Sequence, residues 1–314
     1  MDPTFRTRGR TVVVDAPAAM GIVNASPESF SGDGATTVAQ QVEQVRAQFD
    51  AGALLVDLGG QSANTKTPEL AVEEETARLV PLIEAVRAAG IDGLLSIDTY
   101  KPAVADACLR AGADVINDVS ALHHPALAEV VAEWDAGFVL MHTVGPPKVK
   151  ILERDLYGDV VEDVLDFGHR TLDRLEAAGV SRQQVLFDPG VDFAKTPRQS
   201  LDLVHGIGRM AELGRPLLLA LSRKDFIGAI TGTTPRQRDA GTLAAVGAVA
   251  AAVPETVFRV HDVPATVQYL AVQQAIVQPD RLPVDAVLAD HLRREPVLQP
   301  AGEAADHDHE RRRA

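Results

Sequence analysis

Polar side chains of complementary chemistry recur at the ends of short apolar runs in this chain. Asp98, Asn117 and Asp188 each close such a run, and Lys224 follows another. A single Asp or Asn in this position often only caps the next helix, and a lone lysine is usually only exposed. As a set, two carboxylates, an amide and an ammonium suit a flat heterocycle that alternates hydrogen-bond donors and acceptors. Buried carboxylates without such a partner would be costly.

Further apolar runs end in the same way. Arg259 and His261 add a cation and a base, which suit an anionic leaving group. His142 taken alone would be a satisfied histidine at the rim. The remaining residues of this pattern are Asn24, Asp57, Asp118, Met141, Ser222, Arg223 and Asp262.

The elements that carry these residues alternate between short apolar runs and amphipathic segments. Within 38–49, Val38, Val42, Val45 and Phe49 recur at helical spacing. Strands are predicted at 18–24, 53–58, 93–98, 113–118, 137–142, 184–188, 216–222 and 256–261. Continuously apolar strands, each followed by a helix, predict an α/β fold, a single (β/α)8 TIM barrel whose chemistry lies at the carboxyl ends of its strands. A doubly wound open sheet is the alternative, but no dinucleotide glycine fingerprint supports it.

The chain ends predict extensions on either side of the barrel. Residues 1–17 are expected to form an N-terminal β extension, 18–280 the barrel, and 281–314 a C-terminal extension that is disordered from about 295. The last segment is polar, contains proline and lacks periodicity. Its histidines and arginines are therefore interpreted as a solvated tail, and not as a metal or nucleic-acid site.

Composition excludes several classes of protein. The formal charge of −14 over 314 residues argues against a nucleic-acid or anionic-membrane partner. Cys108 is the only cysteine, so an intramolecular disulfide and a thiolate metal cluster are excluded. The sequence contains no signal-peptide pattern and no apolar run of transmembrane length, which predicts a cytoplasmic location.

Several stretches resemble one known family in order and in spacing. From about residue 18 to about residue 275 the chain resembles the dihydropteroate synthases. The matching stretches are "MGIVNASPESFSGDG", "LLVDLGGQS", "SIDTYKPAVA", "GADVINDVSAL", "VLMHTVGPPK", "VLFDPGVDFAK", "PLLLALSRKDFIG", "AGTLAAV" and "FRVHDV". The resemblance implies a pterin pocket on a barrel.

The resemblance also implies a reaction and a site. The family joins 6-hydroxymethyl-7,8-dihydropterin pyrophosphate to 4-aminobenzoate and releases pyrophosphate. By resemblance, the catalytic residues would be Asp98, Asp188 and Lys224. Hydrogen bonds to the pterin would come from Asp98, Asn117, Asp188 and Lys224, and its faces would be covered by Met141 and Arg259. The pyrophosphate would be bound by Asn24, Arg259 and His261, with a magnesium ion on Asn24. Phe193 and Ser222 would line the side of the aromatic amine.

Two loops depart from the family pattern. In the second, Gln61 replaces Glu, and Ala63, Asn64 and Thr65 stand where Thr, Arg and Pro are expected. Asn64 cannot replace a guanidinium's charge or its paired donors, although Lys66 could compensate as a point charge. In the first loop, the expected Asp has moved from position 32 to Asp33.

These departures leave three interpretations open. The chain could be an authentic dihydropteroate synthase, or a pterin-binding paralogue that has lost condensation or uses another amine. A methyltetrahydrofolate-dependent methyltransferase is the third, disfavoured by "SRK", "RVHD" and "SPESF". A Schiff-base aldolase on Lys224 is disfavoured by the neighbouring Asp225, which opposes the lowered pKa that such a lysine needs. The apolar segment 241–253 could supply a homodimer interface or pack on the barrel through its small residues.

Overall fold

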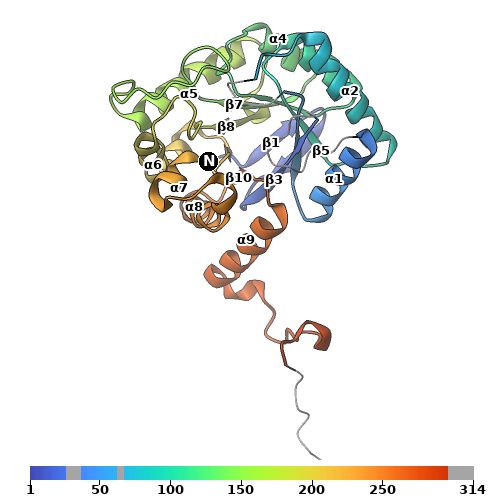
Figure 1. Cartoon of the computed structure of the whole chain (residues 1–314), viewed down its shortest axis with the longest axis vertical. Coiled ribbons are helices and arrows are strands. Elements are labelled where there is room, and N and C mark those ends of the chain that lie inside the picture. The colour runs from blue at the N-terminus through green and yellow to red at the C-terminus, as the bar shows by residue number, and fades with distance from the viewer. Residues whose placement is uncertain (26–36, 62–66, 296–314) are drawn as a thin grey trace, which may run out of the picture. The chain divides into compact units, whose positions relative to one another are not determined.

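The computed structural model describes residues 1–25, 37–61 and 67–295, and its centre is a closed barrel of eight parallel strands (Figure 1). Around the barrel the strands follow the order β10-β3-β4-β5-β6-β7-β8-β9. Their bounds are β3 Ala18–Asn24, β4 Leu55–Gly59, β5 Leu94–Asp98, β6 Val115–Asp118, β7 Gly137–Met141, β8 Val185–Asp188, β9 Leu217–Leu219 and β10 Thr256–Arg259. The predicted TIM barrel is confirmed. Each predicted strand is present, some of them shorter than expected.

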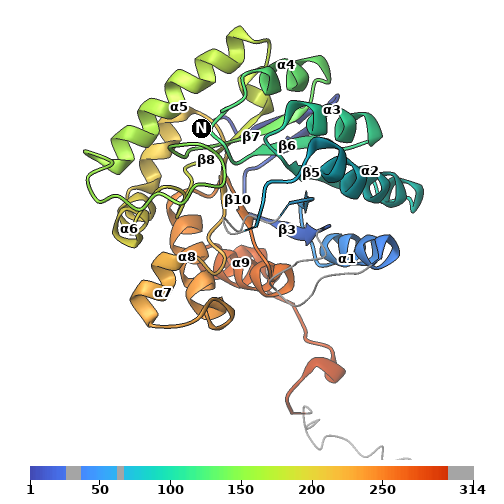
Figure 2. The ribbon, with the colours of Figure 1, turned by 45° about the horizontal axis from the view of Figure 1, so that its top comes forward.

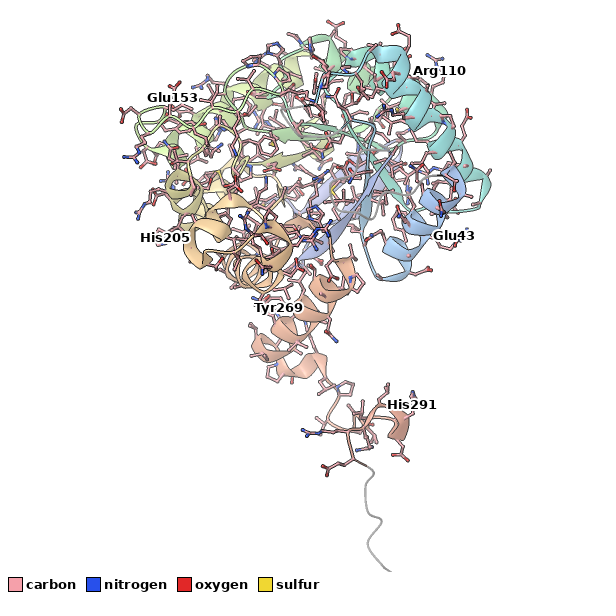
Figure 3. All side chains as sticks on the ribbon, viewed as in Figure 1. Glu43, Arg110, Glu153, His205, Tyr269 and His291 are labelled. Carbon is pink, nitrogen blue, oxygen red and sulfur yellow. The ribbon has the colours of Figure 1, made fainter. Side chains whose placement is uncertain are left out.

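Helices follow the strands and surround the barrel (Figures 1 and 2). They are α1 Val38–Asp50, α2 Val72–Ala88, α3 Pro102–Ala111, α4 Ala126–Glu133, α5 Val160–Ala177, α6 Pro197–His205, α7 Asp225–Thr231, α8 Asp239–Ala252 and α9 Val263–Val277. Short 3-10 helices span Arg182–Gln184, Ile207–Leu213, Pro235–Gln237, Pro279–Arg281 and Asp290–Leu292. Charged side chains such as Glu43 on α1 and Arg110 on α3 lie on the outer surface (Figure 3). Within the described ranges, no helix is both long and apolar enough to cross a bilayer.

Local sequence explains where several helices begin. The Thr37 side chain accepts from the Gln40 amide at the start of α1, and Asp159 accepts from Val161 and Glu162 at the start of α5. At α6, Thr196 forms a reciprocal capping box with Gln199. These side chains accept from backbone N–H groups in the first turns of α1, α5 and α6, and each helix therefore begins at the residue after its cap.

The N-terminal segment forms an antiparallel hairpin of β1 Thr4–Thr7 and β2 Arg10–Val13. Phe5 is fully buried within the apolar cluster at the amino ends of the barrel strands, beside Gly137. A Cβ atom at Gly137 would lie 2.5 Å from the Phe5 ring, so glycine lets the hairpin close this end of the barrel. The predicted β extension is confirmed, and it belongs to the compact unit Met1–Gln273. A second unit begins at Gln274, and the expectation for the tail beyond 295 falls on residues outside the described part.

Strand register brings the predicted polar residues to one rim. Asp98 lies opposite Asn117 in the β5–β6 pair, and Met141 lies opposite Asp188 in the β7–β8 pair. In the β3–β4 pair Asn24 lies opposite Gly59, which in turn faces Asp98 on β5. Because parallel strands all end at the same edge, these side chains surround one mouth of the barrel.

Candidate active site

A buried hydrogen-bond network joins four strands at this mouth. Arg259 on β10 donates from Nε to Asp57 Oδ2 at 2.7 Å and from Nη2 to Asp98 Oδ2 at 3.3 Å. Asp57 also accepts from Asn117 Nδ2 at 3.1 Å and from Ser96 Oγ at 2.6 Å. The Asp57 side chain is fully buried, whereas those of Asp98 and Arg259 are about one-fifth exposed. Asp57 is therefore the hub that orients Arg259 and Asn117, while Asp98 and Arg259 remain accessible to a ligand.

Electrostatics in this network favour a permanent cation beside a titratable acid. Burial raises the pKa of Asp98 to about 7, against the opposing effect of Arg259, and the Asp57 charge adds to the rise. Burial alone would lower the pKa of the Arg259 guanidinium, but Asp57 and Asp98 outweigh it and raise that pKa. Arg259 thus stays charged, while Asp98 can gain or lose a proton near neutral pH.

Asp188 ends β8 and is held by the glycine that follows it. Its side chain is buried, with only 3% of the residue exposed, and Oδ1 accepts from the Gly190 amide at 2.7 Å. Burial raises the pKa of Asp188 to about 6, and the Gly190 amide and the cations of Lys224, Lys195 and Arg259 oppose that rise. Gly190 has φ +71°, and a Cβ atom there would lie 1.9 Å from the His142 carbonyl oxygen. Only glycine allows this loop to pass so close to the end of β7.

Lys224 lies beside the same loop, after β9. Its Nζ donates to the Val191 carbonyl at 2.9 Å and lies 4.4 Å from the centroid of the Phe193 ring. Burial lowers the pKa of the Lys224 ammonium, and Asp192 and Asp188 oppose that shift. The ammonium is therefore near the Asp188 carboxylate and in contact with the predicted amine wall.

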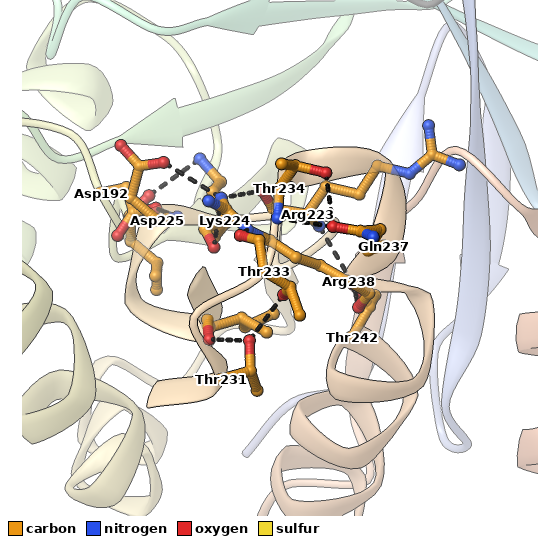
Figure 4. A network of polar contacts seen from close by, with 12 residues as sticks. Asp192, Arg223, Lys224, Asp225, Thr231, Thr233, Thr234, Gln237, Arg238 and Thr242 are labelled. Carbon is orange, nitrogen blue, oxygen red and sulfur yellow. Dashed lines mark hydrogen bonds and ion pairs between the residues drawn. The ribbon is translucent and has the colours of Figure 1, made fainter. Parts of the chain in front are cut away.

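A network behind Lys224 fixes its position (Figure 4). Arg223 has φ +61°, in the left-handed region, and its backbone amide donates to Thr242 Oγ1 at 3.0 Å. Arg238 Nη1 donates to the carbonyls of Arg223 and Lys224 at 2.9 and 3.1 Å. These bonds hold Arg223 in an unfavourable backbone conformation, and residues in such conformations often lie at functional sites.

His261 and Ser222 form a second pair at the rim. His261 Nδ1 and Ser222 Oγ are 2.8 Å apart. Desolvation by neighbouring groups, together with the cations Arg223 and Arg259, lowers the pKa of His261. The imidazole is thus neutral at pH 7 and offers one donor and one acceptor.

A cleft of about 200 Å³ opens next to this network. Among the predicted residues its lining contains Asp98 and Phe193. The remaining lining residues are Gln61, Glu75, Thr99, Tyr100, Val119, Thr143, Pro146, Pro147, Lys148, Val149, Lys150, Asp192 and Ala194. The cleft is thus bounded by the loop after β7 and the loop after β8.

Gln61, which departs from the family pattern, is anchored at this cleft. Its Oε1 accepts from the Leu70 amide at 2.7 Å, and its Nε2 donates to Tyr100 Oη at 3.2 Å. Lys101 Nζ donates to the Leu70 carbonyl at 2.6 Å and to Glu75 at 2.8 Å. The two sides of the second loop are therefore tied together without a carboxylate at position 61. Ala63, Asn64, Thr65 and Lys66, like position 32 and Asp33, lie outside the described residues.

The structure brings most predicted residues together and adds others. Arg259, Asp98 and Asn117 share the Asp57 hub, and Asp188 and Lys224 share the loop after β8. The sequence interpretation gave no role to Asp57, Lys195 or Lys101. Asp57 carried a signal as a charged residue inside the apolar run "LLVDLGG", and Lys101 and Lys195 lie within the stretches "SIDTYKPAVA" and "VLFDPGVDFAK".

Comparison with known proteins agrees with this geometry. The family described as "pterin binding enzyme" matches residues 20–261. The dihydropteroate synthase of Streptococcus pyogenes serotype M6 is 38% identical over 269 residues, which cover 84% of this chain and 97% of that protein.

Solved structures agree as well. The Yersinia pestis dihydropteroate synthase with a sulfonamide drug superposes with a TM-score of 0.80 at 33% identity, over 87% of this chain and 99% of that one. The Xanthomonas albilineans enzyme in complex with 7,8-dihydropteroate gives 0.76 at 38% identity, over 88% and 99%. This chain belongs to the pterin-binding enzymes and, among them, to the dihydropteroate synthases.

Proposed function

We infer that this chain is a transferase of folate biosynthesis. It condenses 6-hydroxymethyl-7,8-dihydropterin pyrophosphate with 4-aminobenzoate, releasing pyrophosphate and forming dihydropteroate. The observation that carries this inference is the buried network of Asp57, Asp98 and Arg259, with Asp188 and Lys224 beside it, at the mouth of a barrel of this family. This membership disfavours the methyltransferase and aldolase alternatives.

The pterin ring would lie between the two groups of polar residues. Asp188 would accept from ring N–H groups, and Lys224 would leave the Val191 carbonyl to donate to a ring acceptor. Asp98 and Asn117 would bond the opposite edge. Met141, only 1% exposed at the end of β7, and Arg259 would cover the ring faces. In this placement the carboxylates accept from ring N–H groups and the ammonium donates to a ring acceptor, so donors and acceptors match along the ring edge.

Chemistry at this site would proceed by charge separation. The C–O bond to the pyrophosphate breaks and leaves positive charge on the pterin methylene, which the carboxylates of Asp98 and Asp188 would stabilise. Arg259 and His261 would donate to the departing oxygens. The lone pair of the amine nitrogen then forms the new C–N bond at the methylene, and the proton that this nitrogen loses passes to the departing pyrophosphate or to water. No side-chain nucleophile is required by this route.

Magnesium fits this site only together with the substrate. Asn24 offers one amide oxygen at the end of β3, and within the described ranges no group of three or more His, Cys, Asp or Glu residues could hold a metal. Mg²⁺ commonly binds through one or two protein oxygens plus substrate phosphates and water. We therefore propose Asn24 as the protein ligand of an ion that arrives with the pyrophosphate. When bound, that ion neutralises charge on the leaving group.

The amine would bind in the cleft between the β7 and β8 loops. Phe193 lines this cleft and would supply an apolar wall. Ser222 is not among the lining residues, and its hydroxyl would act from beside His261. Lys148 and Lys150 also line the cleft or its edge, so cations other than the family's second-loop arginine lie on the amine side. This placement suits an aromatic amine that carries a carboxylate.

We also propose that the enzyme acts in the cytoplasm and that it forms a homodimer through α8. The buried side of α8 packs on α9, where a Cβ atom at Gly247 would lie 1.9 Å from Tyr269 Oη. Its outer side exposes small residues, among them Ala244 and Ala248. Light scattering of the purified chain tests this part of the proposal, because a monomer at micromolar concentration would contradict it.

Pyrophosphate release is the decisive assay. Purified protein with pterin pyrophosphate, magnesium and a panel of aromatic amines should release pyrophosphate when 4-aminobenzoate is present. Release with another amine only would identify a different acceptor. Binding of pterin pyrophosphate with no release for any amine would favour the non-condensing paralogue. No binding at all would refute the pterin site.

A further inference from the structure

A buried lysine outside the predicted site holds the loop that follows β8. Lys195 is 1% exposed. Its Nζ lies 2.9 Å from His142 Nδ1, 3.0 Å from the Gly190 carbonyl oxygen and 3.1 Å from the Phe193 carbonyl oxygen. An ammonium has three N–H groups, so each can have one of these acceptors.

This arrangement is unusual for a buried cation. Buried charges are normally paired with an opposite charge, because removing them from water is costly. In the described parts of the chain, Lys195 has no carboxylate within salt-bridge distance, whereas the buried Lys101 pairs with Glu75 at 2.8 Å. Burial lowers the pKa of Lys195 to about 7. The start of α6 does not require it, because Thr196 and Gln199 already cap that helix.

What Lys195 holds is the loop that sets two pterin-binding groups. Gly190 accepts from Lys195 through its carbonyl and donates through its amide to Asp188 Oδ1 at 2.7 Å. Phe193 accepts from Lys195 through its carbonyl, and its ring lies 4.4 Å from Lys224 Nζ. Moving either carbonyl would therefore move a contact of Asp188 or of Lys224.

We propose that Lys195 is a positioning residue for the pterin site, which fixes the segment 190–193 so that Asp188 and Lys224 face the ring in a set geometry. This inference rests on the proposed function. Because Lys195 is only 1% exposed, it would touch neither substrate. It acts through Gly190 and Phe193, and His142 serves as its third acceptor at the end of β7.

The charge of Lys195 provides a second test of this role, through its effect on the pKa of Asp188. The cations that oppose the raised pKa of Asp188 are Lys224, Lys195 and Arg259. Removing the charge of Lys195 leaves the other two and raises the pKa of Asp188 further above about 6. Pterin binding, which needs the carboxylate, should then fail at a higher pH than in the unchanged protein. A lysine that only stabilised the fold would not change the pH at which pterin binding fails.

The test uses two variants at this position and one matched control. Lys195→Met removes both charge and donors, whereas Lys195→Gln keeps a donor and removes the charge. The control is Arg215→Met. Arg215 is 2% exposed and donates to backbone carbonyls of Val185 and Thr4 at the opposite end of the barrel. It therefore reports the effect of losing a buried cation away from the site.

The measurements are the Kd for 6-hydroxymethylpterin by calorimetry from pH 5 to 8.5 and the Tm of each variant. We expect roughly tenfold to hundredfold weaker binding for Lys195→Met at pH 7, the loss associated with a hydrogen bond to a charged group. For Lys195→Gln we expect a smaller loss of affinity, but pterin binding should still fail at a higher pH than in the unchanged protein. Arg215→Met should lower Tm and leave the Kd within about twofold.

Three results would overturn the proposal. The first is a folded Lys195→Met whose Kd for pterin equals that of the unchanged protein at every pH measured. The second is an equal loss of pterin affinity in Lys195→Met and in Arg215→Met. The third is failure of both Lys195 variants to fold, which would make this lysine a requirement of the fold itself. If the unchanged protein does not bind pterin, the proposed function fails first, and that outcome is distinguishable from the other three.

Discussion

Replacing Arg259 with methionine tests the central network most directly. The change removes the charged partner of Asp57, whose side chain is fully buried, and of Asp98, which is about one-fifth exposed. Breaking a buried ion pair by removing one partner costs roughly 3–5 kcal/mol, because the other charge stays desolvated. Asp57 keeps Ser96 and Asn117 as donors. We therefore expect the free energy of unfolding to fall by about 3 kcal/mol, at the lower end of that range.

A second substitution separates the effect of the unpaired Asp57 charge from the other effects of Arg259→Met. Asp57→Asn removes that charge while leaving an amide oxygen for Ser96. Combined with Arg259→Met, it should recover about 2 kcal/mol of the loss, and the two sites should be strongly coupled in a double-mutant cycle. Activity should not return in the combined variant, because the cation proposed to bind the pyrophosphate is still absent.

The assay is urea unfolding of each variant at pH 7, repeated at pH 5. Without Arg259, which opposes the rise, the pKa of Asp98 should exceed its value of about 7. A carboxyl whose pKa is raised in the folded state stabilises the fold at low pH, and that stabilisation is lost as the pH rises. The loss of unfolding free energy in Arg259→Met should therefore be smaller at pH 5 than at pH 7. Arg209→Met is the control. Arg209 pairs with Glu162 and Glu212 on the surface, so its loss should leave the free energy of unfolding close to that of the unchanged protein.

Two results would refute this reasoning. If Arg259→Met lowers the free energy of unfolding no more than Arg209→Met does, the ion pairs of Arg259 do not stabilise the fold as buried pairs should. If the combined variant is as unstable as Arg259→Met alone, a stranded Asp57 charge is not the cause of the loss.

Three further predictions concern binding and turnover. Asp188→Asn should weaken pterin binding by roughly tenfold to a hundredfold. In the unchanged protein affinity should fall as pH drops through about 6, and a flat profile from calorimetry would contradict the role of Asp188. Chelation of magnesium with EDTA should stop pyrophosphate release yet leave the Kd for 6-hydroxymethylpterin unchanged, since that ligand lacks the oxygens that complete the Asn24 site. Asn64→Arg should raise turnover with 4-aminobenzoate by about tenfold if the second loop lacks a needed guanidinium, and unchanged kinetics would discredit that diagnosis.

The sequence by itself determined the barrel and the composition of its rim. Continuous apolar runs with helices between them mark parallel strands covered on both faces, and the residue that ends each run is then assigned to one mouth. Asp98, Asn117 and Asp188 could be placed at that mouth without coordinates, because strand direction alone decides which end of a strand faces it.

Tertiary structure alone decided which of these residues act on one another. Asp57 and Arg259 lie 202 positions apart, and their contact depends on closure of the barrel between β10 and β3. Lys195 shows the same limit, because one of its three acceptors, His142, comes from another strand end, 53 positions away. Periodicity reports which face of its own element a side chain occupies. It carries no information on the distance to a side chain of another element, and that distance sets both the hydrogen bonds and the charges at this site.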